Sequence, residues 1–310
     1  MSTNSVKVAV IILTINQQRK ATRCLESFRA VTHPSFRIIL WDNGSGDGTP
    51  EIIRQEFPEV LLHRHPSNLG VASGRNEAAK IAIREFNPPY ILFIDNDMTV
   101  SPDFLAKLIA PFETQQDLAQ TAGKIYDLND HRRLYGAGGC RIRFWCGDTG
   151  HVGYGEIDYG QYDKPRKCYP SGGCMLVRTD VFQQLGGFDA VFDPYGPEDL
   201  DFALRVRKAG YYGFFAPDAV VFHETRPGKT FEGGKYTETF ARHRSKHWLL
   251  FMKRHAPLWQ KAIFTSITGP YLFGKVLLRE FKKGNFTVFR GLLTGLAESG
   301  KVKNKGKMTL

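Results

Sequence analysis

Two acidic clusters in the sequence have the spacing for chemistry on charged or hydroxylated ligands. The first is the Asp-Asn-Asp motif at 95–97, which ends an apolar run over 90–94. A hard divalent cation takes carboxylate oxygens and keeps water or substrate phosphates in its other positions, so Asp95 and Asp97 could together reach a metal and a sugar hydroxyl. An ordinary turn before a helix starting near residue 102 would explain the same residues without a ligand.

The second cluster is Glu198-Asp199, which follows a loop framed by proline and glycine at 193–197. Acidic residues at a helix N-terminus complement the helix dipole and need no catalytic reason. Two adjacent acids on such a loop can also present a general base to an acceptor hydroxyl. His223 ends a further apolar run; a structural role is the commoner one there, but with carboxylates this histidine would complete a Mn²⁺-type site.

Two further polar residues stand close to strand or helix ends. Asp42 opens the run 42–49 (DNGSGDGT), which is rich in turn-forming residues but longer than a turn requires. Its carboxylate could accept a hydrogen bond from the imide N–H of a uracil or thymine ring. Arg75 falls in the first turns of the predicted helix 71–85, where it either pairs with Asp95 or a phosphate, or stays on the surface.

The elements that must position these residues alternate between apolar strands and helices. Strands are expected at 6–14, 36–41, 60–63 and 90–94, and helices at 17–30, 50–57 and 71–85. This order predicts a parallel α/β sheet with right-handed crossovers. Ligands of such sheets bind outside the carboxyl ends of the strands, where Thr14, Asp42 and Asp95 fall. Beyond residue 100 the pattern is mixed, with short strands and loops expected over 111–169, a helix at 198–209 and strands at 171–178 and 219–223.

The positive charge belongs to the end of the chain. The net charge is +11, yet residues 240–310 hold 15 Lys+Arg and 2 Asp+Glu, which leaves residues 1–239 at −2. A slightly acidic body argues against nucleic acid as a partner. The tail has no uncharged apolar run long enough to span a bilayer. Its basic, aromatic helices favour an anionic membrane surface, with helices packed on the domain as the alternative.

Seven motifs in this order, from about residue 8 to about residue 223, resemble family 2 glycosyltransferases with the GT-A fold. The detailed pattern is similar to the rhamnosyltransferase-like branch that builds cell-surface polysaccharide. The motifs are Thr14-Ile15-Asn16, 42–49, Asn68-Leu69-Gly70 with Gly74-Arg75-Asn76, 95–97, Ser171-Gly172-Gly173, Gly186-Gly187-Phe188-Asp189 and Glu198-Asp199-Leu200-Asp201.

The resemblance implies a Rossmann-like, mostly parallel sheet flanked by helices, with a basic helical C-terminal extension. Residues 1–239 would be the catalytic domain, with a nucleotide-binding half at 1–100 and an acceptor-binding half at 101–239; residues 240–310 would form the extension. The implied reaction is inverting transfer from a nucleoside diphosphate sugar to the hydroxyl of a saccharide or lipid-linked saccharide. Mn²⁺ or Mg²⁺ would be the cofactor. The absence of a CxxC pair or signal peptide and the basic tail favour a cytoplasmic protein at the inner face of the cell membrane.

The resemblance also assigns roles to single residues. Asp97, Asp95 and His223 would hold the metal, with Asp95 also near the ribose. Thr14 and Asp42 would hold the base, and Arg75 would support Asp95 and the nucleotide. Gly172 and Gly173 would form the wall under the donor sugar. Asp199 would be the general base, with Glu198 beside it.

One departure from the family pattern concerns residues 242–248 (RHRSKHW), which lack the Gln-x-x-Arg-Trp motif of processive members. The sequence therefore favours a single-addition enzyme, in which Arg242 or Arg244 could still contact a diphosphate. Two other functions stay open. A non-catalytic, sugar-nucleotide-binding membrane scaffold would not need the acids at 95, 97 and 199. A sugar nucleotidyltransferase would be expected to carry a glycine-rich, lysine-containing loop that 14–17 lacks. Oligomeric state, donor sugar, base and acceptor identity are not specified by the sequence.

Overall fold

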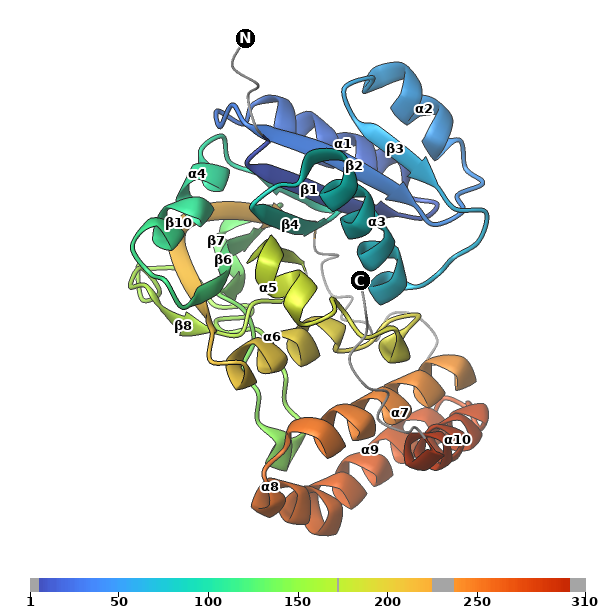
Figure 1. Ribbon diagram of the computed structural model, residues 1–310. Coiled ribbons are helices and arrows are strands. Elements are labelled where there is room, and N and C mark those ends of the chain that lie inside the picture. The colour runs from blue at the N-terminus through green and yellow to red at the C-terminus, as the bar shows by residue number, and fades with distance from the viewer. Residues whose placement is uncertain (1–5, 172, 225–236, 302–310) are drawn as a thin grey trace.

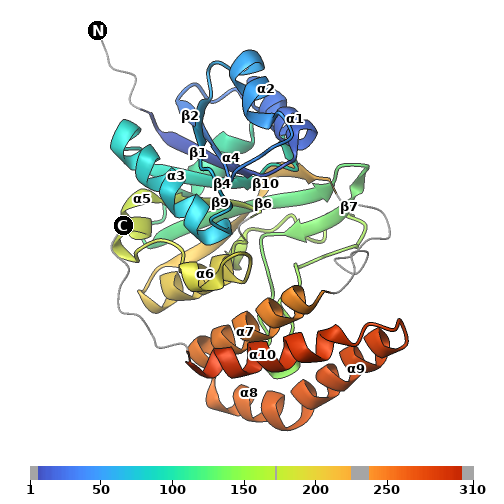
Figure 2. The same ribbon diagram turned by 90° about the vertical axis from the view of Figure 1, so that its right-hand side faces the viewer.

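The computed structural model describes residues 6–171, 173–224 and 237–301. A ten-stranded sheet lies between helices, and the last four α-helices form a further layer beneath it (Figures 1 and 2). The first part of the chain contains β1 (Val8–Thr14), α1 (Gln18–Arg29), β2 (Phe36–Asp42), α2 (Thr49–Glu56), β3 (Leu61–Arg64), α3 (Val71–Phe86) and β4 (Tyr90–Asp95).

These first strands form the expected parallel half of the sheet, in the order β3-β2-β1-β4. In this register Thr14 lies opposite Asp42, and Leu13 lies opposite Asp95. The carboxyl ends of β1, β2 and β4 therefore place Thr14, Asp42 and Asp95 at one edge, as the strand pattern predicted.

Alternation along β1 builds two hydrophobic cores, because successive side chains of a strand point to opposite faces. Val8, Val10 and Ile12 pack with residues of α1, α2 and α4 on one face. Ala9 and Ile11 pack with residues of α3, α5 and α6 on the other. This two-sided burial explains why β1 is a continuous apolar run.

The second part of the sheet is mixed in direction. β9 runs antiparallel to both β4 and β6, β10 runs parallel to β6, and β5 closes the edge antiparallel to β10. The sheet is thus parallel only over its first four strands and mixed beyond β4, where the resemblance implied a mostly parallel sheet. The elements are β5 (Met98–Val100), α4 (Phe104–Ile109), η1 (Ala110–Glu113), β6 (Leu118–Asp127), β7 (Asp130–Ala137), η2 (Phe144–Cys146), β8 (Arg166–Cys168), β9 (Cys174–Arg178), α5 (Thr179–Gln184), η3 (Ala190–Phe192), α6 (Glu198–Lys208) and β10 (Tyr212–His223).

Two strands differ from the sequence expectation. β6 is a ten-residue strand inside the sheet, in a region expected to hold short strands and loops over the sheet. β10 has twelve residues instead of five. Its register shifts between Phe215 and Val220, around Pro217, because proline has no N–H to donate to a ladder.

The C-terminal layer consists of α7 (Glu238–His255), α8 (Leu258–Ile263), the π-helix η5 (Phe264–Thr268), α9 (Gly269–Phe281) and α10 (Thr287–Lys301). α7 attaches the layer to the domain, since Leu250 and Phe251 pack with Phe144 and Phe192. α10 lies against α7 along two glycines: a Cβ at Gly291 or Gly295 would stand 2.2 Å from a carbonyl oxygen of α7. Across the described ranges, no helix combines the length and apolarity needed to cross a bilayer.

Candidate active site

A cavity of about 1210 Å³ opens at the carboxyl edge of the sheet and continues toward the C-terminal helices. Residues singled out from the sequence line it, among them Asp95 at the end of β4, Gly173 before β9, Asp199 in the first turn of α6, and His223 at the end of β10. Residues more than a hundred positions apart in the chain thus meet in one space.

Asp97 lies beside this cavity between two nitrogen groups. Its Oδ1 is 3.3 Å from His223 Nε2, and its Oδ2 accepts a hydrogen bond from Lys20 Nζ at 2.9 Å. Burial alone would raise the pKa of Asp97, but the hydrogen bonds and charges of His223 and Lys20 outweigh it and lower the pKa to about 2. Asp97 is therefore a carboxylate at any physiological pH.

The other ring nitrogen of His223, Nδ1, is buried and has no hydrogen-bond partner among the described residues. The His223 ring lies 4.1 Å from the ring of Tyr135, centroid to centroid. Within the described ranges no three His, Cys, Asp or Glu side chains are grouped to hold a metal ion. The Asp97–His223 pair nevertheless offers the oxygen and nitrogen donors that suit Mn²⁺, and such ions commonly complete their coordination with water and substrate phosphates.

Asp95 turns toward a buried arginine instead of joining the Asp97–His223 pair. Arg75, on α3, donates to Asp95 Oδ1 at 2.7 Å and to Glu198 Oε1 at 3.2 Å. Burial raises the pKa of Asp95 although Arg75 opposes the shift, and 44% of the Asp95 side-chain surface still faces the cavity. Arg75 itself is only 5% exposed, so the arginine predicted to support Asp95 does so from inside the protein.

The two adjacent acids at 198 and 199 separate into different environments. Glu198 is 5% exposed and does not line the cavity, and its Oε2 has no hydrogen-bond partner in the described structure. Burial and the charge of Asp199 raise the pKa of Glu198 to about 8, because the opposing charge of Arg75 does not compensate for them. Asp199 lines the cavity, and its Oδ1 accepts from the Leu200 N–H at 2.7 Å. Of the two predicted catalytic acids, Asp199 lines the cavity and Glu198 does not.

The loop that precedes Asp199 and leads into α6 is fixed to α3 by Asp193. Asp193 Oδ1 accepts from the N–H of Ala72 at 2.9 Å, and Oδ2 accepts from the Ser73 hydroxyl at 2.5 Å. Gly70 makes room for this contact: its φ is +93°, and a Cβ there would stand 2.3 Å from Asp193 Oδ1. Asp193 and Gly70 therefore join the loop before α6 to the start of α3.

The residues assigned to the base are buried in local contacts. Thr14 Oγ1 accepts from Asn96 Nδ2 at 2.9 Å, which ties β1 to the 95–97 motif. Asp42 is 0% exposed; its Oδ1 accepts from the Ser45 N–H at 3.0 Å and from the Ser45 hydroxyl. Asp42 thus stabilises its own turn here, and its contact with a base remains a prediction.

The wall predicted at 171–173 is described in part. Gly172 lies outside the described residues. The carbonyl of Gly173 accepts from the Asp95 N–H at 3.0 Å, so this glycine contacts the acidic motif through its backbone.

Several residues of the site carried no sequence signal. Lys20 comes from the first turn of α1, and Tyr135 and His151 come from the segment between the recognisable motifs. Arg244 of the predicted pair lines the cavity, whereas Arg242 does not and forms an ion pair with Glu298.

The chain matches the models of two protein families. The model of the family "Glycosyl transferase family 2" matches residues 9–186, and that of "N-terminal domain of galactosyltransferase" matches residues 156–232. The N-acetylglucosaminyl-diphospho-decaprenol L-rhamnosyltransferase of Mycobacterium tuberculosis is 25% identical over 84% of this chain and 89% of that protein.

Two solved structures illustrate the fold. Mannosyltransferase PcManGT from Pyrobaculum calidifontis, in complex with GDP-Man and Mn²⁺, covers 98% of this chain and 77% of its own, with a TM-score of 0.55 and 17% identity. S. aureus TarS 1-349 in complex with UDP-GlcNAc covers 95% and 80%, with a TM-score of 0.60 and 16% identity. These likenesses confirm the predicted GT-A architecture.

Proposed function

This chain belongs to glycosyl transferase family 2 and is therefore an enzyme that transfers a sugar, and we propose that it moves the sugar from a nucleoside diphosphate sugar to an acceptor hydroxyl with inversion. The observation that carries the proposal is that Asp199 shares one cavity with Asp95 and His223. Displacement of the diphosphate at C1 of the sugar requires a general base for the acceptor hydroxyl and residues that bind the leaving diphosphate, and both must lie in one cavity. The family assignment sets aside the scaffold and the nucleotidyltransferase.

Metal dependence is part of this proposal. Asp97 and His223 would hold Mn²⁺ or Mg²⁺, and two solved structures of the same fold, one with GDP-Man and one with UDP and GalNAc, contain Mn²⁺. When bound, the divalent cation would offset the negative charge of the leaving diphosphate. Lys20 donates to Asp97 Oδ2 at 2.9 Å, so this lysine would have to release Oδ2 if a cation bound that oxygen.

The remaining steps belong to residues of the chain. Arg75 holds Asp95 in place from the buried side, and the Asp193 contact to α3 keeps the loop with Asp199 in position. Asp199 takes the proton of the acceptor hydroxyl while the acceptor oxygen forms its bond to C1. The bond from C1 to the diphosphate oxygen breaks, and its electron pair leaves with the nucleoside diphosphate.

The first test is binding of donor, measured by thermal shift. UDP-, dTDP- and GDP-sugars are screened with Mn²⁺ or Mg²⁺, and one of them should raise the melting temperature by several degrees. A ligand at a hundred times its Kd stabilises the folded state by about 2.7 kcal/mol. We expect Asp97→Asn to show no larger rise in melting temperature with Mn²⁺ or Mg²⁺ than without it.

Asp218→Asn is the matched control for this test, because Asp218 is exposed on the same strand as His223 and does not line the cavity. It should keep the full shift. No shift with any sugar nucleotide would contradict the proposed donor class, and a metal-dependent shift that survives in Asp97→Asn would contradict the assigned metal residue.

The acceptor is proposed to be a saccharide, free or lipid-linked, in cell-surface polysaccharide synthesis at the inner face of the membrane. The M. tuberculosis relative is named for a lipid-linked acceptor, which supports this setting. Exposed large apolar side chains gather on the last helices: Leu258, Trp259, Ile267, Tyr271, Leu278, Phe281, Phe286, Phe289, Leu293 and Leu296. Apolar side chains among lysines and arginines suit an anionic bilayer surface.

Vesicle sedimentation tests the membrane contact. The protein should bind phosphatidylglycerol vesicles more tightly than phosphatidylcholine vesicles, and 1 M salt should weaken the binding. Trp259→Ser should lower the partition coefficient about tenfold, because burial of a large apolar side chain contributes about 1.5–3 kcal/mol. Tyr159→Ser, at an aromatic residue 87% exposed on the catalytic domain, should change nothing. Equal binding to both lipids, or equal losses in both variants, would contradict a membrane role for the tail.

A further inference from the structure

The cavity does not end at the catalytic acids. Beyond Asp199 it continues along one face of α7, where Phe240, Arg244, His247 and Trp248 all line it. These positions follow the i, i+4, i+7 and i+8 spacing of a single helix face. α7 therefore forms a wall of the same cavity that holds Asp199.

The part of this wall nearest the catalytic loop is polar. His247 Nδ1 lies 2.9 Å from the carbonyl oxygen of Tyr195, so Nδ1 carries the proton, and Nε2 is a buried acceptor without a partner among the described residues. Burial lowers the pKa of His247 to about 4, although the Tyr195 contact opposes this, so the ring stays neutral. His247 is 1% exposed, so it adds a neutral ring to the lining beside the 193–197 loop.

Arg244 supplies a positive charge to the same wall. Its side chain is exposed, and no carboxylate in the described structure lies within ion-pair distance of it. Arg242, two residues earlier, is already paired with Glu298 and lies outside the cavity lining. An unpaired guanidinium in a cavity suits an anionic group, above all a phosphate.

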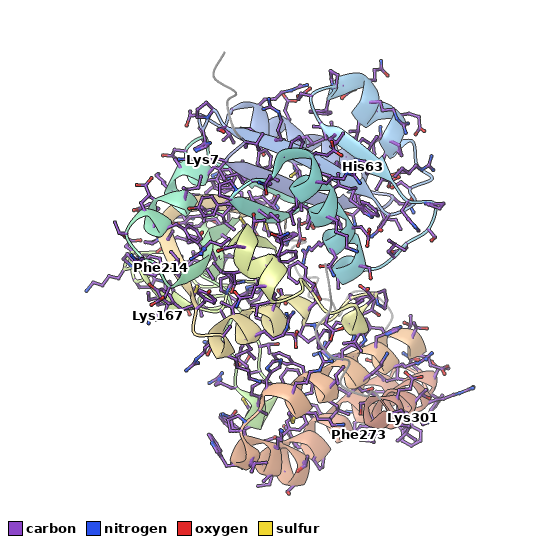
Figure 3. The ribbon with its side chains drawn as sticks, viewed as in Figure 1. Lys7, His63, Lys167, Phe214, Phe273 and Lys301 are labelled. Carbon is purple, nitrogen blue, oxygen red and sulfur yellow. The ribbon has the colours of Figure 1, made fainter. Side chains whose placement is uncertain are left out.

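The far end of the cavity is apolar. Leu272, Phe273 and Val276 of α9 face it together with Leu292, Leu293 and Leu296 of α10, and Figure 3 shows Phe273 in this layer. Leu293 and Leu296 are 43% and 52% exposed, so this end reaches the surface where the exposed apolar side chains of the tail gather. Apolar lining of this kind suits a hydrocarbon chain.

We propose that this cavity binds the acceptor as a saccharide on a phosphorylated lipid. The sugar lies between Asp199 and His247, the phosphate meets Arg244, and the first part of the lipid chain lies between α9 and α10. The proposal rests on the proposed glycosyltransferase function and specifies the acceptor. It is supported by the single cavity whose lining includes Asp199, Arg244 of α7 and apolar side chains of α9 and α10.

Binding of farnesyl diphosphate to the full chain tests this assignment by titration calorimetry, with EDTA present to exclude metal-dependent binding at the donor site. Farnesyl diphosphate should bind at least about tenfold more tightly than inorganic diphosphate or farnesol. Inorganic diphosphate lacks the chain that would contact the apolar lining, and farnesol lacks the phosphates that would meet Arg244. Equal affinity for farnesyl diphosphate and inorganic diphosphate would overturn the lipid part of the proposal.

Two variants with matched controls locate the binding. Arg244→Gln and the double variant Leu293→Ser/Leu296→Ser should each weaken farnesyl diphosphate binding about tenfold. Lys253→Gln, on the same helix but outside the cavity, and Leu258→Ser, 83% exposed on α8, should bind as the unchanged chain does. All replaced side chains are at least partly exposed, so the variants should fold. Unchanged affinity in either cavity variant would overturn the assigned contact.

The donor thermal shift separates the two proposals. Arg244→Gln and Leu293→Ser/Leu296→Ser should keep the shift with the sugar nucleotide. If the chain shows the donor thermal shift but does not prefer farnesyl diphosphate as described, the acceptor site alone is refuted. Absence of any donor shift while farnesyl diphosphate still binds as expected would refute the donor instead.

Discussion

Replacement of Asp199 by asparagine should lower turnover by about 10²–10⁴-fold and leave the donor thermal shift unchanged. Removal of a general base costs about this factor, because the acceptor hydroxyl then has no group to take its proton during attack on C1. Asp199 is the acid of the 198–199 pair that lines the cavity. The measurement is kcat and KM for nucleoside diphosphate release with a saccharide acceptor.

Glu198→Gln is the informative comparison, since it changes the neighbouring carboxyl in the same way. Glu198 is buried against Arg75, and its pKa is raised to about 8, so near neutral pH a neutral glutamine imitates its protonated form. We expect this variant to lose far less activity than Asp199→Asn. If Glu198→Gln were the more damaging change, the general base would be Glu198 and the assignment above would be wrong.

Arg75→Met should destabilise the protein by about 3–5 kcal/mol, the cost of removing one partner from a buried ion pair. The buried guanidinium donates to Asp95 at 2.7 Å and to Glu198 at 3.2 Å, so its removal would leave the Asp95 carboxylate without its cationic partner beside the buried Glu198 carboxyl. Urea unfolding at pH 7 measures the change, with the midpoint expected to fall while the slope is kept.

Two companion variants decide whether the loss comes from the charge cluster. Arg84→Met changes an arginine of the same helix that is 69% exposed and paired only with Glu85, and it should cost less than about 0.5 kcal/mol. Adding Asp95→Asn to Arg75→Met should recover part of the loss, because the carboxylate left without its arginine partner is then neutral. Similar losses for Arg75→Met and Arg84→Met would show that the buried cluster contributes nothing special.

The parallel half of the fold could be predicted because its strands are buried on both faces and read as continuous apolar runs. β6 could not be predicted in this way, since Gln120, Thr121 and Lys124 interrupt its apolar pattern while lying inside the protein. The Lys124 ammonium is satisfied by Asp158 at 2.9 Å and Asp163 at 2.5 Å. Because these two aspartates lie more than 30 positions away from Lys124, a local sequence pattern does not show that the lysine is paired and buried.

The candidate site shows the same limit. The resemblance grouped Asp95, Asp97 and His223 around one metal, whereas the structure pairs Asp97 with His223 and turns Asp95 toward Arg75. Glu198 and Asp199 are adjacent carboxylic acids, yet the Glu198 side chain is buried in the protein and Asp199 lines the cavity. That difference arises from Arg75, 123 positions away from Glu198, and is invisible in a local pattern.

The cavity has one acidic end and one apolar end, and this polarity bears on the kinetic order of the two substrates. A water-soluble donor that enters at the acidic end and a lipid that diffuses laterally into the apolar end need not pass each other. Neither has to bind first, so initial rates should follow a random sequential scheme instead of an ordered one. The rate of acceptor binding would then depend on the number of lipid-linked acceptors per unit area of membrane. The rate of donor binding would depend on the donor concentration in solution.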